Sequence, residues 1–167
     1  GIDEEGVDRK FAGLHADPGV TGLAVLAFLG AGYTHEEGQY ADQVDRALSW
    51  LIRQQDDDGF LGGNATRYAR MYCHAIATYA MAEALGMQTD RATLDRLRGP
   101  VERAVGYIVA TQNPADGGWR YLPGQKSDIG QLLYYLDGAH FCDYLDQFRS
   151  DDYEANVRIF ETYAEEA

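Results

Sequence analysis

Cysteine is scarce in this sequence of 167 residues. It occurs only as Cys73 and Cys142, and neither belongs to a pair with the spacing of metal ligands, such as Cys-x-x-Cys. The sequence therefore gives no sign of a cysteine-based metal site, and we expect two buried thiols.

Basic residues are also scarce. Lys and Arg number 14 against 27 Asp and Glu, which gives a formal net charge of −13 at pH 7. A surplus of negative charge this large repels phosphate backbones and anionic lipid surfaces. Nucleic acid is therefore not an expected partner.

Long apolar runs do not occur. The longest, residues 20–31, has about a dozen residues, whereas a helix that spans a bilayer needs roughly 20. We expect no transmembrane segment. The composition of 46% hydrophobic and 25% charged residues is instead typical of one folded domain, because enough apolar surface can be buried to offset chain entropy.

The clearest feature that is present is an internal repeat. Residues 44–55 match residues 101–112 at a constant offset of 57, with Val, Arg, Ala and Gln kept and Trp50 replaced by Tyr107. An Asp-Gly turn follows each copy. A repeat with this period indicates an array of similar structural units.

Hydrophobic periodicity predicts two alternating types of helix. Within each copy the apolar residues recur every three or four positions, which predicts amphipathic outer helices at 40–55 and 100–112. The segments at 19–30 and 68–85 are more apolar and richer in small residues, which is typical of inner helices screened by protein on most sides. The repeating unit is therefore an αα-hairpin.

Gly99 and Pro100 predict the start of the second outer helix. Proline suits a first helical turn, where its missing N–H would be unpaired anyway. A short helix over residues 92–98 would then end at Gly99.

The pattern changes after residue 127. An apolar helical stripe between residues 129 and 136 begins an altered third unit, and residues 134–167 contain eight Tyr and Phe side chains among many acidic ones. We expect a divergent helical segment here, which serves as a cap or as an interaction surface.

The two copies, RALSWLIRQQ from Arg46 and RAVGYIVATQNPADGGW from Arg103, resemble the QW motif of the squalene–hopene cyclase and prenyltransferase superfamily. The inner segments PGVTGLA and MYCHAIA look like those of bacterial squalene cyclase-like repeat proteins, so the resemblance covers about residues 13–130. It implies an α/α toroid in which inner helices line a central cavity.

The resemblance also implies structural roles for the motif residues. These are Arg46, Trp50, Gln55 and Gly59 in the first copy and Arg103, Tyr107, Gln112, Gly117 and Trp119 in the second. A glutamine can bond exposed backbone at a helix end while an aromatic ring covers it. The first copy departs from the pattern because Leu61 stands where Trp is expected.

The acidic runs do not match known catalytic motifs. Asp56-Asp57-Asp58 is not the Asp-x-Asp-Asp motif with which class II cyclases protonate an alkene, and we expect a solvated turn there. Neither this run nor residues 151–154 has the Asp-Asp-x-x-Asp spacing that holds magnesium in terpene synthases. No catalytic residue is assigned, and no metal or cofactor is expected.

Zinc, which protein prenyltransferases hold through Asp, Cys and His, is the remaining metal hypothesis. It would draw on Cys73, His74, His140, Cys142 and Asp143. Residues one or two apart on a helix point to different sides, which disfavours local chelation, but a site across helices that uses His74 and Cys142 stays open.

His74 has two further interpretations. With Tyr72, Arg67 and Tyr79 it is a candidate polar spot in an apolar, aromatic ligand cavity. Alternatively, it is a hydrogen-bonded histidine of the core.

These observations predict an all-α fold of αα-hairpin repeats that form part of an α/α toroid. The expected divisions are an N-terminal extension (1–12), the repeats (13–130) and the divergent C-terminal helical segment (131–167). Two clear units do not close a ring, so we expect a capping tail, a homodimer or missing repeats of a longer chain.

Two functions follow as hypotheses. The first is a squalene cyclase- or prenyltransferase-like protein that lacks the catalytic acid and binds a hydrophobic small molecule in the toroid cavity. The alternative is a noncatalytic repeat module for protein–protein interaction. A polysaccharide-cleaving toroid is a distant third, because no positioned pair of carboxylates is identifiable.

Overall fold

The computed structural model describes residues 13–87, 91–115 and 117–126. These residues form four α-helices and no strand, so the expectation of an all-helical fold is confirmed for this part of the chain. The helices are α1 (Asp17–Gly30), α2 (Ala41–Arg53), α3 (Arg67–Gly86) and α4 (Arg91–Ala110). Within the described residues, no helix is long and apolar enough to cross a membrane.

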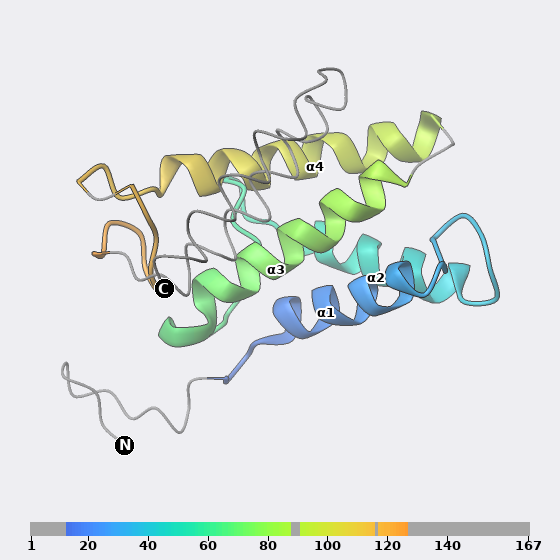
Figure 1. The fold of residues 1–167 in the computed structure, drawn as a ribbon, viewed down its shortest axis with the longest axis horizontal. Helices are drawn as coiled ribbons and strands as arrows, with labels where there is room; N and C mark the ends of the chain where they lie inside the picture. The colour runs from blue at the N-terminus through green and yellow to red at the C-terminus, as the bar shows by residue number, and fades with distance from the viewer. Residues whose placement is uncertain (1–12, 88–90, 116, 127–167) are drawn as a thin grey trace, which may run out of the picture.

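The helices alternate in direction as hairpins do. In Figure 1, α1 and α3 run side by side in the same direction, while α2 and α4 run back. α3 lies between α1 and α4 and packs against both, and α2 packs against α1. α1 and α3 correspond to the segments expected as inner helices, and α2 and α4 to those expected as outer helices.

Small residues let α1 and α3 approach closely. A Cβ atom built on Gly19 would lie 3.0 Å from the Sγ atom of Cys73, and one built on Gly22 would lie 3.0 Å from the carbonyl oxygen of Ile76. Side chains at these two positions would force the helices apart. The glycines thus set the spacing of the inner pair.

The core has two parts. The larger one lies between all four helices and includes Val25, Leu48, Met81 and Leu97, each at most 1% exposed. The smaller one joins the start of α3, the end of α4 and the turns that follow α2 and α4, and its buried members are Phe60, Met71, Ala75, Ile108 and Trp119.

The predicted helix break at Gly99 is wrong. α4 is continuous from Arg91 to Ala110 and carries Pro100 in its interior. Proline removes one helical hydrogen bond. Tertiary packing offsets that loss, because Pro100 is buried and its carbonyl oxygen accepts a hydrogen bond from the Gln55 side chain at 2.8 Å. Contacts between helices therefore override the local sequence signal for a helix break at this point.

The expectation that both inner helices are screened on most sides holds for α3 but is wrong for α1. Ten residues of α3 are buried. On α1, by contrast, Val20 is 63% and Leu23 54% exposed. The proposed N-terminal extension and the segment from residue 131 onward lie outside the described residues, as does the altered third unit after residue 127.

Candidate functional site

α3 carries all four residues that the sequence proposed for a cavity, but it presents them on two faces. Tyr72 and Tyr79 are seven residues apart, which is about two helical turns, so they share one face. Arg67 and His74 are also seven apart and share another face, roughly opposite. The structure therefore does not bring these four residues together as one site.

His74 lies in the core. It has no exposed surface, and its Nδ1 atom accepts a hydrogen bond from the backbone N–H of Leu61 at 3.0 Å. Its ring packs against the rings of Phe60 and Tyr107, with centroids 5.3 and 4.9 Å away. This environment corresponds to the core-histidine interpretation.

Burial keeps His74 neutral. It lowers the pKa of the imidazole from 6.5 to about 3, and this effect exceeds the opposing influence of the Ala104 backbone and the Asp58 carboxylate. Because Nδ1 accepts a hydrogen bond, the ring proton resides on Nε2. That atom has no hydrogen-bond partner of normal geometry among the described residues.

The opposite side of α3 carries a group of aromatic rings. Tyr68 contacts Tyr121 edge to face at 4.9 Å between centroids, and Tyr72 lies 6.2 Å from the same ring. The guanidinium of Arg120 lies 5.3 Å from the Tyr121 ring centroid. We call Tyr68, Tyr72, Tyr79 and Tyr121 the tyrosine face.

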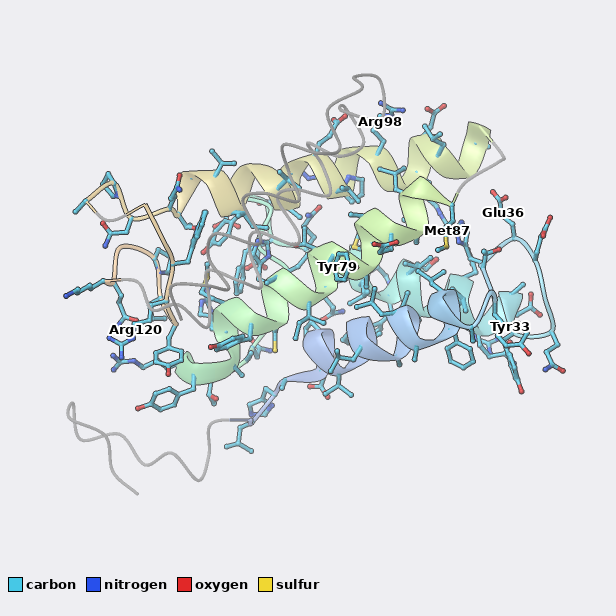
Figure 2. All side chains as sticks on the ribbon, in the orientation of Figure 1. Tyr33, Glu36, Tyr79, Met87, Arg98 and Arg120 are labelled. Atoms are coloured by element: carbon cyan, nitrogen blue, oxygen red, sulfur yellow. The ribbon has the colours of Figure 1, made fainter. Side chains whose placement is uncertain are left out.

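Sequence reasoning missed two members of this face. Tyr68 precedes Tyr72 by four residues, a helical spacing that could have revealed it. Tyr121 comes from the loop after α4, and no pattern in the sequence links it to α3. Figure 2 shows Tyr79 near the middle of α3 and Arg120 beside the N-terminal end of that helix.

The turn after α2 ties the two hairpins together. The Nε2 group of Gln55 donates to the carbonyl oxygens of Gly59, within the turn, and Pro100, in α4, at 3.1 and 2.8 Å. Its Oε1 atom accepts a hydrogen bond from Arg103 at 2.7 Å. Gln55 thus contacts its own turn and the neighbouring outer helix at once.

Gly59 makes this contact sterically possible. Its φ angle is +94°, and a Cβ atom added there would lie 2.2 Å from the carbonyl oxygen of Arg103. The turn backbone and α4 are therefore in direct contact, and only glycine fits between them.

The turn after α4 repeats the local geometry. The Gln112 side chain donates to the carbonyl oxygen of Gly117 at 2.6 Å, and Gly117 has a φ angle of +75°. Trp119 is 6% exposed, and its Nε1–H group donates to the carbonyl oxygen of Ile108 at 2.8 Å. The indole thus adds a hydrogen bond to a carbonyl near the end of α4.

The backbone closes both turns in the same way. The N–H group of Asp56 donates to the carbonyl oxygen of Phe60 at 2.9 Å, and that of Asn113 donates to the carbonyl oxygen of Gly118 at 2.8 Å. The repeat detected in the sequence is therefore also a repeat in three dimensions at these turns.

Phe60 supplies the aromatic ring that the first copy lacks at Leu61. Both residues have no exposed surface, and the Phe60 ring lies 5.1 Å from that of Tyr107 and belongs to the same cluster as Trp119. The Arg70 guanidinium lies 4.0 Å from the Phe60 ring centroid. Sequence reasoning did not single out Phe60, because its position is shifted by one residue.

The remaining motif residues have different environments. Trp50 is half-buried against the larger core, whereas Arg46 is exposed. Tyr107 is half-buried, and desolvation raises the pKa of its hydroxyl.

Among the described residues, the acidic turn and the candidate metal ligands do not come together as a metal site. Asp56, Asp57 and Asp58 are all exposed, and the Asp58 Oδ1 atom accepts a hydrogen bond from the backbone of Phe60 at 3.0 Å. In the part of the chain that the structure describes, no three His, Cys, Asp or Glu side chains are grouped to hold a metal ion. His140, Cys142 and Asp143 lie outside it.

Comparison with known proteins gives two relatives in bacteria. The chain is 35% identical over 112 residues to drimenyl diphosphate synthase of Streptomyces showdoensis, which covers 66% of this chain and 19% of that protein. It is 32% identical over 103 residues to drimenyl diphosphate synthase of Streptantibioticus cattleyicolor, which covers 58% of this chain and 19% of that protein. The matched region thus spans about a fifth of each relative's length.

No protein-family profile matches the chain, and no solved structure does. The two partial similarities, together with the all-helical fold, indicate a relationship to terpene cyclase-related proteins.

Proposed function

We propose that this chain is a terpene cyclase-like repeat protein whose inner helix α3 lines an apolar cavity for a hydrophobic isoprenoid ligand. The tyrosine face is the observation that carries this proposal, because it presents several aromatic rings on the side of α3 away from His74. Aromatic rings provide large apolar contact area for a hydrocarbon chain. The name of the two relatives, drimenyl diphosphate synthase, supports a terpenoid as the ligand class.

The proposal assigns a ligand-binding role to this chain and no catalytic step. The carboxylates of Asp56, Asp57 and Asp58 are exposed to solvent in a turn, so none of them is a buried proton donor. We further propose that the motif glutamines, glycines and aromatic residues act as ties between helices, as in the QW motif. Gln55 has the hydrogen bond to α4 that such a role requires, and Trp119, whose indole donates to Ile108 of its own helix, packs in one cluster with Met71 and Ala75 of α3.

Equilibrium dialysis of the full chain against farnesol, an uncharged isoprenoid alcohol, tests the proposal. We expect saturable binding that Tyr72→Ala weakens roughly 3- to 10-fold, since the apolar contact area lost with the ring is worth on the order of 1 kcal/mol. Tyr33→Ala is the matched control, because Tyr33 is also half-buried but lies at the opposite end of the molecule from Arg120 (Figure 2). Absence of saturable binding, or equal losses for both variants, would overturn the proposal.

The alternative function, a noncatalytic module for protein–protein interaction, has one observation in its favour: the exposed apolar residues of α1. Mass spectrometry of material that co-purifies from the native host separates the two. A bound isoprenoid lipid supports the first function, and a stoichiometric protein partner supports the second.

A further inference from the structure

The side of α3 that carries the tyrosine face also carries one carboxylate. Residues separated by four, three and four positions share one face of a helix, and on α3 they are Tyr72, Ile76, Tyr79 and Glu83. All four are half-buried. Glu83 is the only acidic residue of α3, and it lies about one turn beyond Tyr79 toward the C-terminal end of the helix.

The position of Glu83 is electrostatically unfavourable. It lies in the last turn of α3, where the backbone carbonyl groups give the helix end a partial negative charge, and that turn has no basic residue. α1 packs along α3 and has no charged residue beyond its first turn, where Asp17 lies. The net charge of −13 on the whole chain adds to the repulsion.

The carboxylate of Glu83 has no compensating contact within the described part of the chain. It forms no hydrogen bond and no ion pair with any residue there. A half-buried charge in this situation loses hydration that no protein group replaces. A glutamine of the same shape would avoid that cost, so the stability of the fold does not account for a glutamate at this position.

We propose that Glu83 binds the polar end of the ligand, accepting a hydrogen bond from a protonated amine or a hydroxyl group while the hydrocarbon chain lies along the tyrosine face. This inference rests on the proposed function. The helix rises about 16 Å from Tyr72 to Glu83, which is the scale of an extended farnesyl chain. The ligand class is an isoprenoid alcohol or amine, and the amine binds more tightly because a charge-assisted hydrogen bond is stronger.

The opposite end of the tyrosine face has the opposite charge. The guanidinium of Arg120 lies there, 5.3 Å from the centroid of the Tyr121 ring, and an anionic head group would bind at that end. Arg120 is exposed and already contacts an aromatic ring, whereas Glu83 is half-buried and lacks a described partner. These differences favour the Glu83 end for the polar group of the ligand.

Equilibrium dialysis of the full chain against farnesylamine, farnesol and farnesyl diphosphate tests the assignment at neutral pH, where the amine is protonated. We expect farnesylamine to bind about 3- to 10-fold more tightly than farnesol, and farnesyl diphosphate to bind more weakly than either. Glu83→Gln should abolish the amine preference, and the variant should fold because it removes an unfavourable charge from a helix end. Glu102→Gln is the matched control, because Glu102 is an exposed glutamate of α4, and it should keep the preference.

Carbodiimide coupling tests the geometry. The reagent activates a carboxyl group, and the nitrogen of bound farnesylamine then displaces a urea and forms an amide with that carboxyl. Peptide mapping by mass spectrometry should find this amide at Glu83 well above its level at Glu102, and excess farnesol should suppress it.

Three results would overturn the role of Glu83: tighter binding of farnesyl diphosphate than of farnesylamine, an amine preference that survives in Glu83→Gln, or no enrichment of the amide at Glu83. If farnesol still binds saturably and Tyr72→Ala weakens that binding, the tyrosine face remains the ligand-binding wall and only the role of Glu83 is wrong. If none of the three ligands binds saturably, both proposals are wrong.

Discussion

Replacing Gly59 with alanine is expected to be far more destabilising than the same change at Gly117. The two glycines occupy equivalent positions in the two turns, and both have a positive φ angle, +94° and +75°. An alanine in this region of backbone conformation costs about 1–2 kcal/mol. Both variants should lose that amount.

Only Gly59 adds a steric conflict to the backbone cost. A new Cβ atom there would lie 2.2 Å from the Arg103 carbonyl oxygen, whereas nothing lies within 4 Å of a Cβ atom at Gly117. The conflicting atom belongs to the backbone of α4, which cannot rotate away as a side chain could. Overpacking of this kind adds about 1–3 kcal/mol, so Gly59→Ala should exceed Gly117→Ala by that amount.

Urea unfolding followed by far-UV circular dichroism measures the difference. We expect both variants to keep the slope of the wild-type transition and to lower its midpoint, with a clearly larger shift for Gly59→Ala. Equal midpoints for the two variants would refute the reasoning, because the turn after α2 would then not be packed against α4.

Three further predictions concern the same turns and the buried histidine. Trp119→Ala should lower the free energy of unfolding by about 3 kcal/mol, because it empties a buried site and removes a hydrogen bond to α4; an unchanged melting temperature would contradict this role. Gln55→Leu should destabilise the chain more than Gln112→Leu in the same urea assay, since only Gln55 has described contacts with a second helix, and a reversed order would be inconsistent with the tie. The free energy of unfolding should also fall as the pH drops from 6.5 toward 3, and His74 contributes at most about 1.4 kcal/mol per pH unit to this fall. In this range the imidazole of the unfolded chain is protonated, whereas the buried imidazole of the folded chain stays neutral. His74→Leu should flatten this slope while lowering stability at neutral pH, and an unchanged slope would show that His74 is not its source.

The sequence predicted the helices well where periodicity and small residues agree. The expected inner helices at 19–30 and 68–85 correspond closely to α1 and α3, and the outer helix at 40–55 corresponds to α2. The short helix expected over residues 92–98 and the outer helix expected from residue 100 are instead one continuous helix, α4, which begins at Arg91. Proline is a local stop signal, and the contact from Gln55 that stabilises the helix around Pro100 comes from 45 residues away, which no local pattern reports.

The candidate site was only partly predictable. A histidine near two tyrosines on one helix suggested a shared cavity, but helical geometry places His74 on the side opposite Tyr72. The contact with Tyr121 depends on how the loop after α4 folds back, and the burial of His74 depends on Phe60 in another turn. Tertiary packing decides both, so residue type alone could not separate a core histidine from a ligand contact.

Photoaffinity labelling tests the central claim most directly. A farnesyl chain that carries a diazirine group, bound to the full chain and irradiated, should label peptides of α3 between Tyr68 and Tyr79 and the loop that holds Tyr121. Excess farnesol should compete the label away. Saturable labelling confined to the exposed apolar residues of α1, or label spread over the surface without competition, would contradict the assignment of the tyrosine face as the ligand-binding wall.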